Sequence, residues 1–145
     1  MRIYLHNEDI KITQIAFSEC FVNFSREKGK RLMGIFVSSE TPLAPSTPVV
    51  SDIQTTSVRL SWFPPGYDGN SPITSYNVYA KKGSDNWNLH KDDINPSDRQ
   101  MSVTLRNLSP HTQYQFHVRA VNSVGEGTPS GASGVIRTLI AGNCY

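Results

Sequence analysis

The 145-residue sequence is poor in cysteine, in charge and in long apolar runs, and each shortage excludes a class of protein. Its two cysteines, Cys20 and Cys144, cannot supply a disulfide framework or a four-ligand zinc site. Charged residues make up 18% of the chain, too few for an extended solvated helix or a coiled coil. No apolar run approaches the roughly 20 residues of a membrane-spanning helix, so we expect no direct membrane insertion. The net charge of +2 gives no reason to expect binding to nucleic acid.

Motifs of catalysis and metal binding are also missing. The chain has no Gly-x-Ser-x-Gly or His-Glu-x-x-His motif, and Gly125-Glu126-Gly127 is better suited to a turn than to a phosphate. Its four histidines lack metal-ligand spacing. Asp92, Asp93 and Asp98 stand without the wider oxygen-rich cluster that calcium needs. We therefore expect no enzyme activity, no metal and no cofactor.

The sequence is rich in short runs with a period of two, separated by turn residues. In residues 58–62 the apolar side chains Val58, Leu60 and Trp62 alternate with polar ones. Residues 76–80 and 114–120 show the same alternation. One apolar and one polar face is typical of an antiparallel strand with one side on a core. Several such runs at regular spacing predict a β-sandwich or barrel.

Three of these stretches resemble the fibronectin type III domain. Residues 57–65, Ser-Val-Arg-Leu-Ser-Trp-Phe-Pro-Pro, resemble its second strand, and residues 71–79 resemble its third. Residues 108–122 resemble its corner and sixth strand, so the resemblance covers about residues 44–139. No cysteine lies in that range, so the Cys…Trp…Cys pattern of immunoglobulin domains is absent.

The resemblance implies an all-β fold, a seven-stranded immunoglobulin-like β-sandwich of fibronectin type III type. We expect the domain at residues 43–139, followed by a C-terminal tail at 140–145. The expected strands are Val49–Ile53, Ser57–Phe63, Ser75–Lys82, Asn86–His90, Gln100–Leu105, Gln113–Asn122 and Gly134–Leu139.

The resemblance also assigns structural roles to buried side chains. Trp62 is expected between the two sheets, and Tyr114 is expected at the tyrosine corner, where its hydroxyl bonds to backbone slightly upstream. The expected structural core is Trp62, Tyr76, Leu108, Tyr114, Phe116 and Val118.

Residues 1–42 match no family, and we expect them to form an unassigned, poorly structured and flexible N-terminal segment. Charged residues come too early for a signal peptide. Residues 10–24 are apolar without a helical stripe, and strand alternation fails after Ile12. Residues 32–37 are the one candidate for a short strand. A bridge between Cys20 and Cys144 is not expected.

By resemblance, the chain is expected to be a non-enzymatic protein-interaction and spacer module from a larger cell-surface adhesion or receptor protein. Its partners would be other proteins, including neighbouring modules or further copies of itself. The alternative is an intracellular, cytoplasmic module of a muscle or cytoskeletal scaffold protein. A domain without cysteine is compatible with either compartment.

Recognition is expected at the loops after the second and sixth strands, because loops on a rigid scaffold commonly carry binding residues. The candidates are Tyr67, Asp68, Asn70, Ser123, Val124 and Glu126. A second candidate surface is the sheet face with Tyr79, Lys81 and Trp87, although Trp87 is expected to pack over the sheet. Asn107-Leu108-Ser109 is a possible N-glycosylation site if the chain is secreted.

Overall fold

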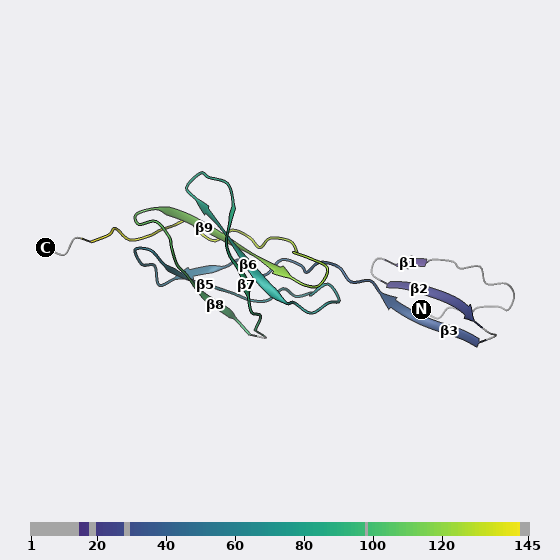
Figure 1. The fold of residues 1–145 in the computed structure, drawn as a ribbon. Coiled ribbons are helices and arrows are strands. Elements are labelled where there is room, and N and C mark those ends of the chain that lie inside the picture. Colours follow the sequence, from purple (N-terminus) through teal and green to yellow (C-terminus); the bar gives the residue numbers. More distant parts are fainter. Residues whose placement is uncertain (1–14, 18–19, 28–29, 98, 143–145) are drawn as a thin grey trace. The chain divides into compact units, whose positions relative to one another are not determined.

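The computed structural model describes residues 15–17, 20–27, 30–97 and 99–142, with side chains from residue 38 onward (Figure 1). The chain divides into two units, Met1–Ser38 and Ser39–Tyr145. Where residues are described, the regular elements are all strands. None of these residues belongs to a helix long and apolar enough to cross a membrane.

The first unit contains a three-stranded antiparallel sheet in the order β1-β2-β3. Its strands are β1 (Ile15–Phe17), β2 (Cys20–Glu27) and β3 (Lys30–Val37). The candidate strand at residues 32–37 lies within β3, but β1 and β2 were not expected. The register sets Ile15 opposite Val22 in β1 and β2, and Phe21 opposite Phe36 in β2 and β3. Such pairing lies across the sheet and is not revealed by a test of alternation along one strand.

Two antiparallel sheets form the second unit and contain all seven strands expected there. The four-stranded sheet has the order β10-β9-β6-β7, and the three-stranded sheet has the order β4-β5-β8. Figure 1 shows β6, β7 and β9 running together, with β5 and β8 beside them. The strands are β4 (Val49–Ser51), β5 (Val58–Trp62), β6 (Ser75–Lys82), β7 (Asn88–Ile94), β8 (Met101–Leu105), β9 (Gln113–Val121) and β10 (Ile136–Arg137).

Strand β7 extends four residues beyond the end expected from the sequence, to Ile94 rather than His90. The pairing of β6 with β7 shifts register twice, between Tyr76 and Val78 and between Val78 and Tyr79. These irregularities let the strand continue through the polar Asp92-Asp93 pair, since a bulge re-aims the residues that follow it. Acidic residues are disfavoured in strands, and for that reason the sequence pattern placed the end too early.

Strand β10 is shorter than expected, and the segment just before it pairs with β9 through serine side chains as well as backbone. The Oγ atoms of Ser130 and Ser133 accept hydrogen bonds from the β9 amides of Val118 and Phe116, at 2.9 and 3.0 Å. The backbone amides of the same two serines donate to the carbonyls of those β9 residues, both at 2.8 Å. Residues 130–133 therefore follow β9 as an irregular edge, and a regular ladder is left only at Ile136–Arg137.

The core lies between the two sheets, and the six side chains expected there are all buried. Trp62 and Tyr76 meet edge to face, with ring centroids 5.6 Å apart. At the corner before β9, the amide of Ser109 donates a hydrogen bond of 3.0 Å to the hydroxyl of Tyr114. This bond fixes the connection between the two sheets, as a tyrosine corner does.

Of the two cysteines, Cys20 begins β2, whereas Cys144 lies outside the described residues. The expectation that the two remain unbridged stays a prediction.

Candidate functional site

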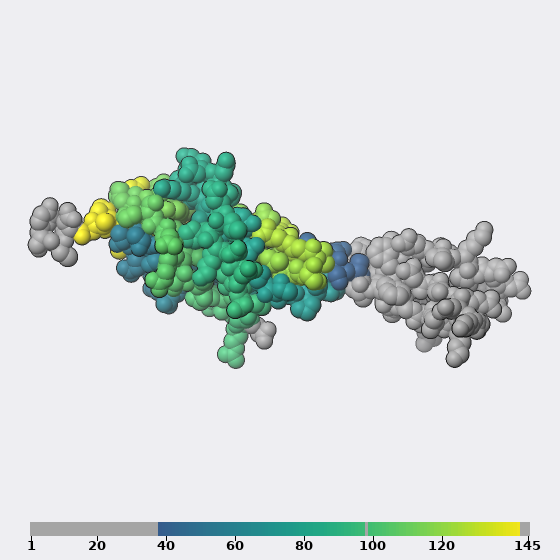
Figure 2. All heavy atoms as spheres, in the orientation of Figure 1, coloured from purple at the N-terminus to yellow at the C-terminus, as the bar shows by residue number. Residues whose placement is uncertain are grey.

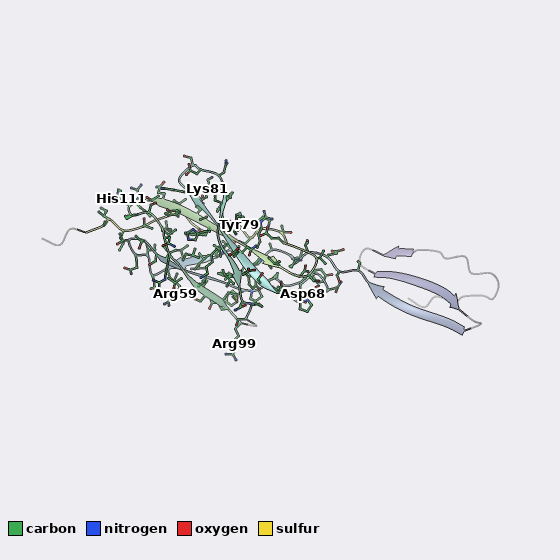
Figure 3. All side chains as sticks on the ribbon, viewed as in Figure 1. Arg59, Asp68, Tyr79, Lys81, Arg99 and His111 are labelled. Carbon is green, nitrogen blue, oxygen red and sulfur yellow. The ribbon has the colours of Figure 1, made fainter. Side chains whose placement is uncertain are left out.

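The loop after β5 is held in shape by its own side chains. The amide of Asn70 donates to Asp68 Oδ1 at 3.0 Å, and Asn70 Nδ2 donates to the Tyr67 hydroxyl at 2.6 Å. Gly69 and Asn70 have φ angles of 80° and 56°, the left-handed region that glycine and asparagine tolerate best. Asp68 and Asn70 are exposed and Tyr67 is half-buried, so the loop presents polar groups on a fixed backbone (Figure 3).

The loop after β9 is joined to the first loop. Ser123 Oγ and Ser71 Oγ lie 2.7 Å apart, a hydrogen-bond distance. The amide of Val124 donates to Asn122 Oδ1 at 2.9 Å, and half of the Val124 surface is exposed. Five of the six candidate binding residues, Tyr67, Asp68, Asn70, Ser123 and Val124, therefore lie at one end of the sandwich; we call this set the loop end.

The residues that lead into the domain also lie at this end. The amides of Glu40 and Leu43 donate to the carbonyls of Gly69 and Tyr67, at 2.8 and 3.1 Å. On the other side, the amide of Thr128 donates to the carbonyl of Pro42 at 3.3 Å. Residues 40–43, which we call the lead-in segment, thus pair with both loops. The hydrogen bonds of the second unit therefore extend to residue 40, on the N-terminal side of the expected domain start at residue 43.

Figure 2 shows this arrangement in space-filling form, with the dark blue lead-in segment against the yellow-green residues that follow β9.

Two glycines make room for the lead-in segment. A Cβ atom at Gly69 would collide with the carbonyl oxygen of Glu40, and one at Gly127 would collide with that of Pro42. Gly127 has no positive φ, so its requirement for glycine comes from this close approach alone.

Asn122 connects all three segments, and the sequence analysis did not single it out. Its Nδ2 donates to the carbonyls of Glu40 at 2.5 Å and Asp68 at 2.8 Å. Its Oδ1 accepts from the amides of Val124 and Gly125, at 2.9 and 3.2 Å. The signal that could have found it is an asparagine that ends an apolar strand and precedes a glycine-containing turn, since asparagine commonly bonds to backbone two residues on.

Glu126 is not part of the loop end, contrary to the expectation. Its carboxylate lies on the outer face of the four-stranded sheet and accepts hydrogen bonds of 2.9 Å from both Asn77 Nδ2 and the Tyr79 hydroxyl. Arg119 Nη1 lies 3.8 Å from the same carboxylate. An isolated bridge between Val121 and Glu126 turns this residue back over the strand. Glu126 therefore stabilises the sheet face and is engaged within the domain.

The same sheet face carries a row of aromatic rings. Trp87 packs on His117 with centroids 4.3 Å apart, and His117 lies 5.0 Å from the Tyr79 ring. As expected, Trp87 packs over the sheet. Tyr79 has a second neighbour, because Arg119 lies over its ring at 5.6 Å from the ring centre. Figure 3 shows Lys81, next along β6, at the far end of this face from Asp68.

The surroundings of this row shift two pKa values. Burial lowers the pKa of His117 below its usual range, and the positive charge of Arg119 lowers it further against the opposing effect of Glu126. Burial and the hydrogen bond to Glu126 raise the pKa of the Tyr79 hydroxyl. In the core, burial raises the pKa of Tyr76 to about 12. The imidazole of His117 is therefore neutral at pH 7, and both tyrosines keep their protons.

Asn107 lies in the loop between β8 and β9 and is exposed. Its φ of 62° is left-handed, while the following Leu108 is buried. Lys82 Nζ donates to Ser109 Oγ at 3.2 Å. The asparagine side chain is thus accessible in the folded domain, and the serine of the sequon is engaged.

The sandwich, its strand order and the tyrosine corner define an immunoglobulin-like β-sandwich module. A family model described as "Fibronectin type III domain" matches residues 43–135, and the chain belongs to this family.

Similar proteins include chains far longer than this one. The chain is 41% identical over 96 residues to "Cell adhesion molecule-related/down-regulated by oncogenes" of Homo sapiens, a match that covers 66% of this chain and 7% of that protein. It is 40% identical over 110 residues to "Protein sidekick-1" of Gallus gallus, with 72% and 5% covered. It is 38% identical over 109 residues to "Titin homolog" of Caenorhabditis elegans; this match covers 74% of this chain and a share of that very long protein that rounds to 0%. The chain thus spans less than a tenth of each of these relatives.

Among solved structures, titin domains A168–A170 match with a TM-score of 0.64 and 28% identity, over 83% of this chain and 40% of that one.

Proposed function

We propose that the domain is a non-enzymatic interaction and spacer module of a larger cell-surface adhesion or receptor protein. Support comes from the relatives, one of which is named as related to cell adhesion molecules and is far longer than this chain. The observation that carries the spacer role is the lead-in segment, which is seated between the two loops of the loop end.

The lead-in segment gives the chain a fixed direction where it enters the domain. Hydrogen bonds at Glu40, Pro42 and Leu43 tie three of its four residues to the loops. Asn122 adds a side-chain bond from a buried position. A flexible linker would lack such bonds and would let neighbouring domains reorient freely. Pairing of this kind suits a module that transmits orientation along an array.

The loop end supplies the interaction surface. Tyr67, Asp68, Asn70, Ser123 and Val124 combine an aromatic ring, a charge and exposed apolar surface on loops that are already braced. A braced loop loses little conformational entropy on binding. We assign recognition of a protein partner, a neighbouring module or a second copy to this end. The sheet face with Tyr79, Lys81 and Trp87 is the weaker candidate, because its aromatic rings already pack on His117.

The spacer role is tested by amide hydrogen exchange at Leu43 and Thr128. Gly127→Ala should expel Pro42 and speed exchange at both amides by at least about tenfold, which corresponds to roughly 1.4 kcal/mol of local stability. Gly66→Ala is the matched control, because a Cβ atom there meets nothing within 4 Å. Unchanged exchange in Gly127→Ala would show that the segment is not held as proposed.

The interaction role is tested with multimerised domain on intact cells, measured by flow cytometry. Tyr67→Ala and Val124→Asp should reduce binding to the cell surface by about tenfold or more, as expected for residues at the centre of an interface. Val49→Asp is the control, because Val49 lies in β4, outside the loop end, and 63% of its surface is exposed. Equal binding by all variants would reject the loop end as the recognition surface.

The alternative is an intracellular module of a muscle or cytoskeletal scaffold, which the similarity to titin favours. Asn107 separates the two possibilities, because its exposed side chain can carry a glycan only in the secretory pathway. We propose that the parent protein carries a glycan on Asn107. A mass shift on N-glycosidase treatment that disappears in Asn107→Gln supports the cell-surface assignment. A parent protein inaccessible to impermeant labelling reagents on intact cells would support the intracellular one.

A further inference from the structure

A hollow of about 510 Å³ lies at the margin of the sandwich, away from the loop end. It is lined by His90 and Lys91 from β7 and by Arg106 and Asn107, which follow β8. We call these four residues the basic hollow. All four side chains bring N–H donors, and no carboxylate lines the space.

The walls of the basic hollow are fixed by a contact between the two sheets. His90 Nε2 lies 2.9 Å from the carbonyl oxygen of Arg106. A carbonyl oxygen can only accept, so Nε2 carries the proton and donates it. On one wall, Lys91 is paired with Val78 of the neighbouring strand. On the other wall, Leu105 pairs with Val58 directly before Arg106. Both basic residues therefore project from a positioned backbone.

Within the described part of the domain, Lys91 and Arg106 form no ion pair with a carboxylate. Among the described residues the ion pairs join Arg59 with Asp52 and Arg119 with Glu126. Lys91 and Arg106 take part in neither. Two positive charges thus face one concave space that has donors and lacks an anionic partner.

We propose that the basic hollow binds a tetrahedral oxoanion, a sulfate or phosphate group. The planar guanidinium of Arg106 suits two parallel hydrogen bonds to such a group, and the Lys91 ammonium adds a compact charge. The volume of about 510 Å³ exceeds that of one ion and lies within the roughly 300–1,000 Å³ of small-molecule sites. The anion is therefore expected to be a substituent of a larger molecule.

The test is a titration of the isotope-labelled, unglycosylated chain with sodium sulfate, followed by NMR at constant ionic strength against sodium chloride. Saturable shifts confined to residues 90, 91, 106 and 107 are expected. Arg106→Gln and Lys91→Gln should each weaken binding by about tenfold, the effect of losing one hydrogen bond to a charged group. Arg99→Gln is the matched control, because Arg99 is exposed and does not line the basic hollow.

Two further arms identify the source of the oxoanion. Inorganic phosphate and a sulfated oligosaccharide are titrated in the same way. Tighter binding of the oligosaccharide by about tenfold or more assigns the basic hollow to a sulfated polysaccharide, whereas equal binding of all three assigns it to a free anion.

The proposal is overturned if chloride produces the same shifts as sulfate. It is also overturned if Arg106→Gln binds sulfate as the unmodified chain does, or if Arg99→Gln weakens binding equally. Tyr67→Ala and Val124→Asp should bind sulfate as the unmodified chain does, because the loop end is not part of the basic hollow. Failure of the cell-binding experiment would therefore not change the result of this titration. A thermal melt of each variant separates loss of the site from loss of the fold.

Discussion

Replacement of Asn122 by alanine should be among the most destabilising changes of a polar residue in this domain. Asn122 is only 4% exposed, and its amide makes four hydrogen bonds to backbone. A hydrogen bond of this kind contributes about 1 kcal/mol net, and leaving a buried partner unsatisfied costs about 1–3 kcal/mol. Four bonds set a ceiling near 4 kcal/mol, which water entering the vacated space would reduce. We therefore expect a loss of about 2–4 kcal/mol.

That loss is large against the roughly 5–15 kcal/mol by which a small domain is usually stable. Urea unfolding, followed by tryptophan fluorescence, measures it directly because Trp62 is buried in the core. Asn122→Asp keeps the acceptor for Val124 but turns a carboxylate toward two carbonyl oxygens. At pH 7 it should lose at least as much stability as the alanine variant.

Asn88→Ala is the matched control for this prediction. Asn88 is exposed, and its side chain makes one local bond of 3.0 Å to the carbonyl of Asn86. Its replacement should change stability by less than about 0.5 kcal/mol. A loss below about 1 kcal/mol in Asn122→Ala would refute the reasoning, because the lead-in segment and both loops would then be held without this amide.

Four further predictions concern other parts of the chain. Tyr114→Phe should cost about 1–3 kcal/mol in urea unfolding by leaving the Ser109 amide without its acceptor, and an unchanged midpoint would argue against the corner. Trp62→Ala should cost about 3–5 kcal/mol, enough to abolish cooperative unfolding by circular dichroism in a marginal domain. The folded-state pKa of His117 is lowered, so the stability contributed by its neutral form is complete above the unfolded pKa near 6.5 and is lost as pH falls below that value. The melting temperature should therefore drop between about pH 7.5 and 5.5, and it should drop less in His117→Gln. Limited proteolysis should cut first within residues 1–38, which form a unit separate from the sandwich, and a full-length chain that resists cleavage would contradict the expected flexibility.

The alternation of apolar and polar residues was enough to predict antiparallel strands in a β-sandwich or barrel, and the resemblance to the fibronectin type III domain implied the sandwich. Val58, Leu60 and Trp62 are all buried in β5, while Arg59 between them is exposed. Such a pattern is local, because successive side chains of a strand point to opposite faces whatever the partner strand is. The tyrosine corner was expected from the resemblance to the fibronectin type III domain, and the hydroxyl of Tyr114 accepts its bond from the backbone of Ser109, five residues upstream. Strands β1 and β2 escaped prediction because their pairing is defined across the sheet and not by alternation along the chain.

Only the tertiary structure decided which groups share a surface. Glu126 follows the loop in sequence, yet an isolated bridge to Val121 turns its carboxylate toward Tyr79, 47 residues away. Asn122 and Glu40 meet across 82 residues, and His90 meets the carbonyl of Arg106 from the opposite sheet. These contacts depend on how two sheets and their loops are brought together, and no periodicity along the chain encodes that distance. The sequence pattern therefore determined the core positions and the order of strands in the sandwich, whereas the hydrogen bonds that hold the lead-in segment and the basic hollow follow from long-range packing.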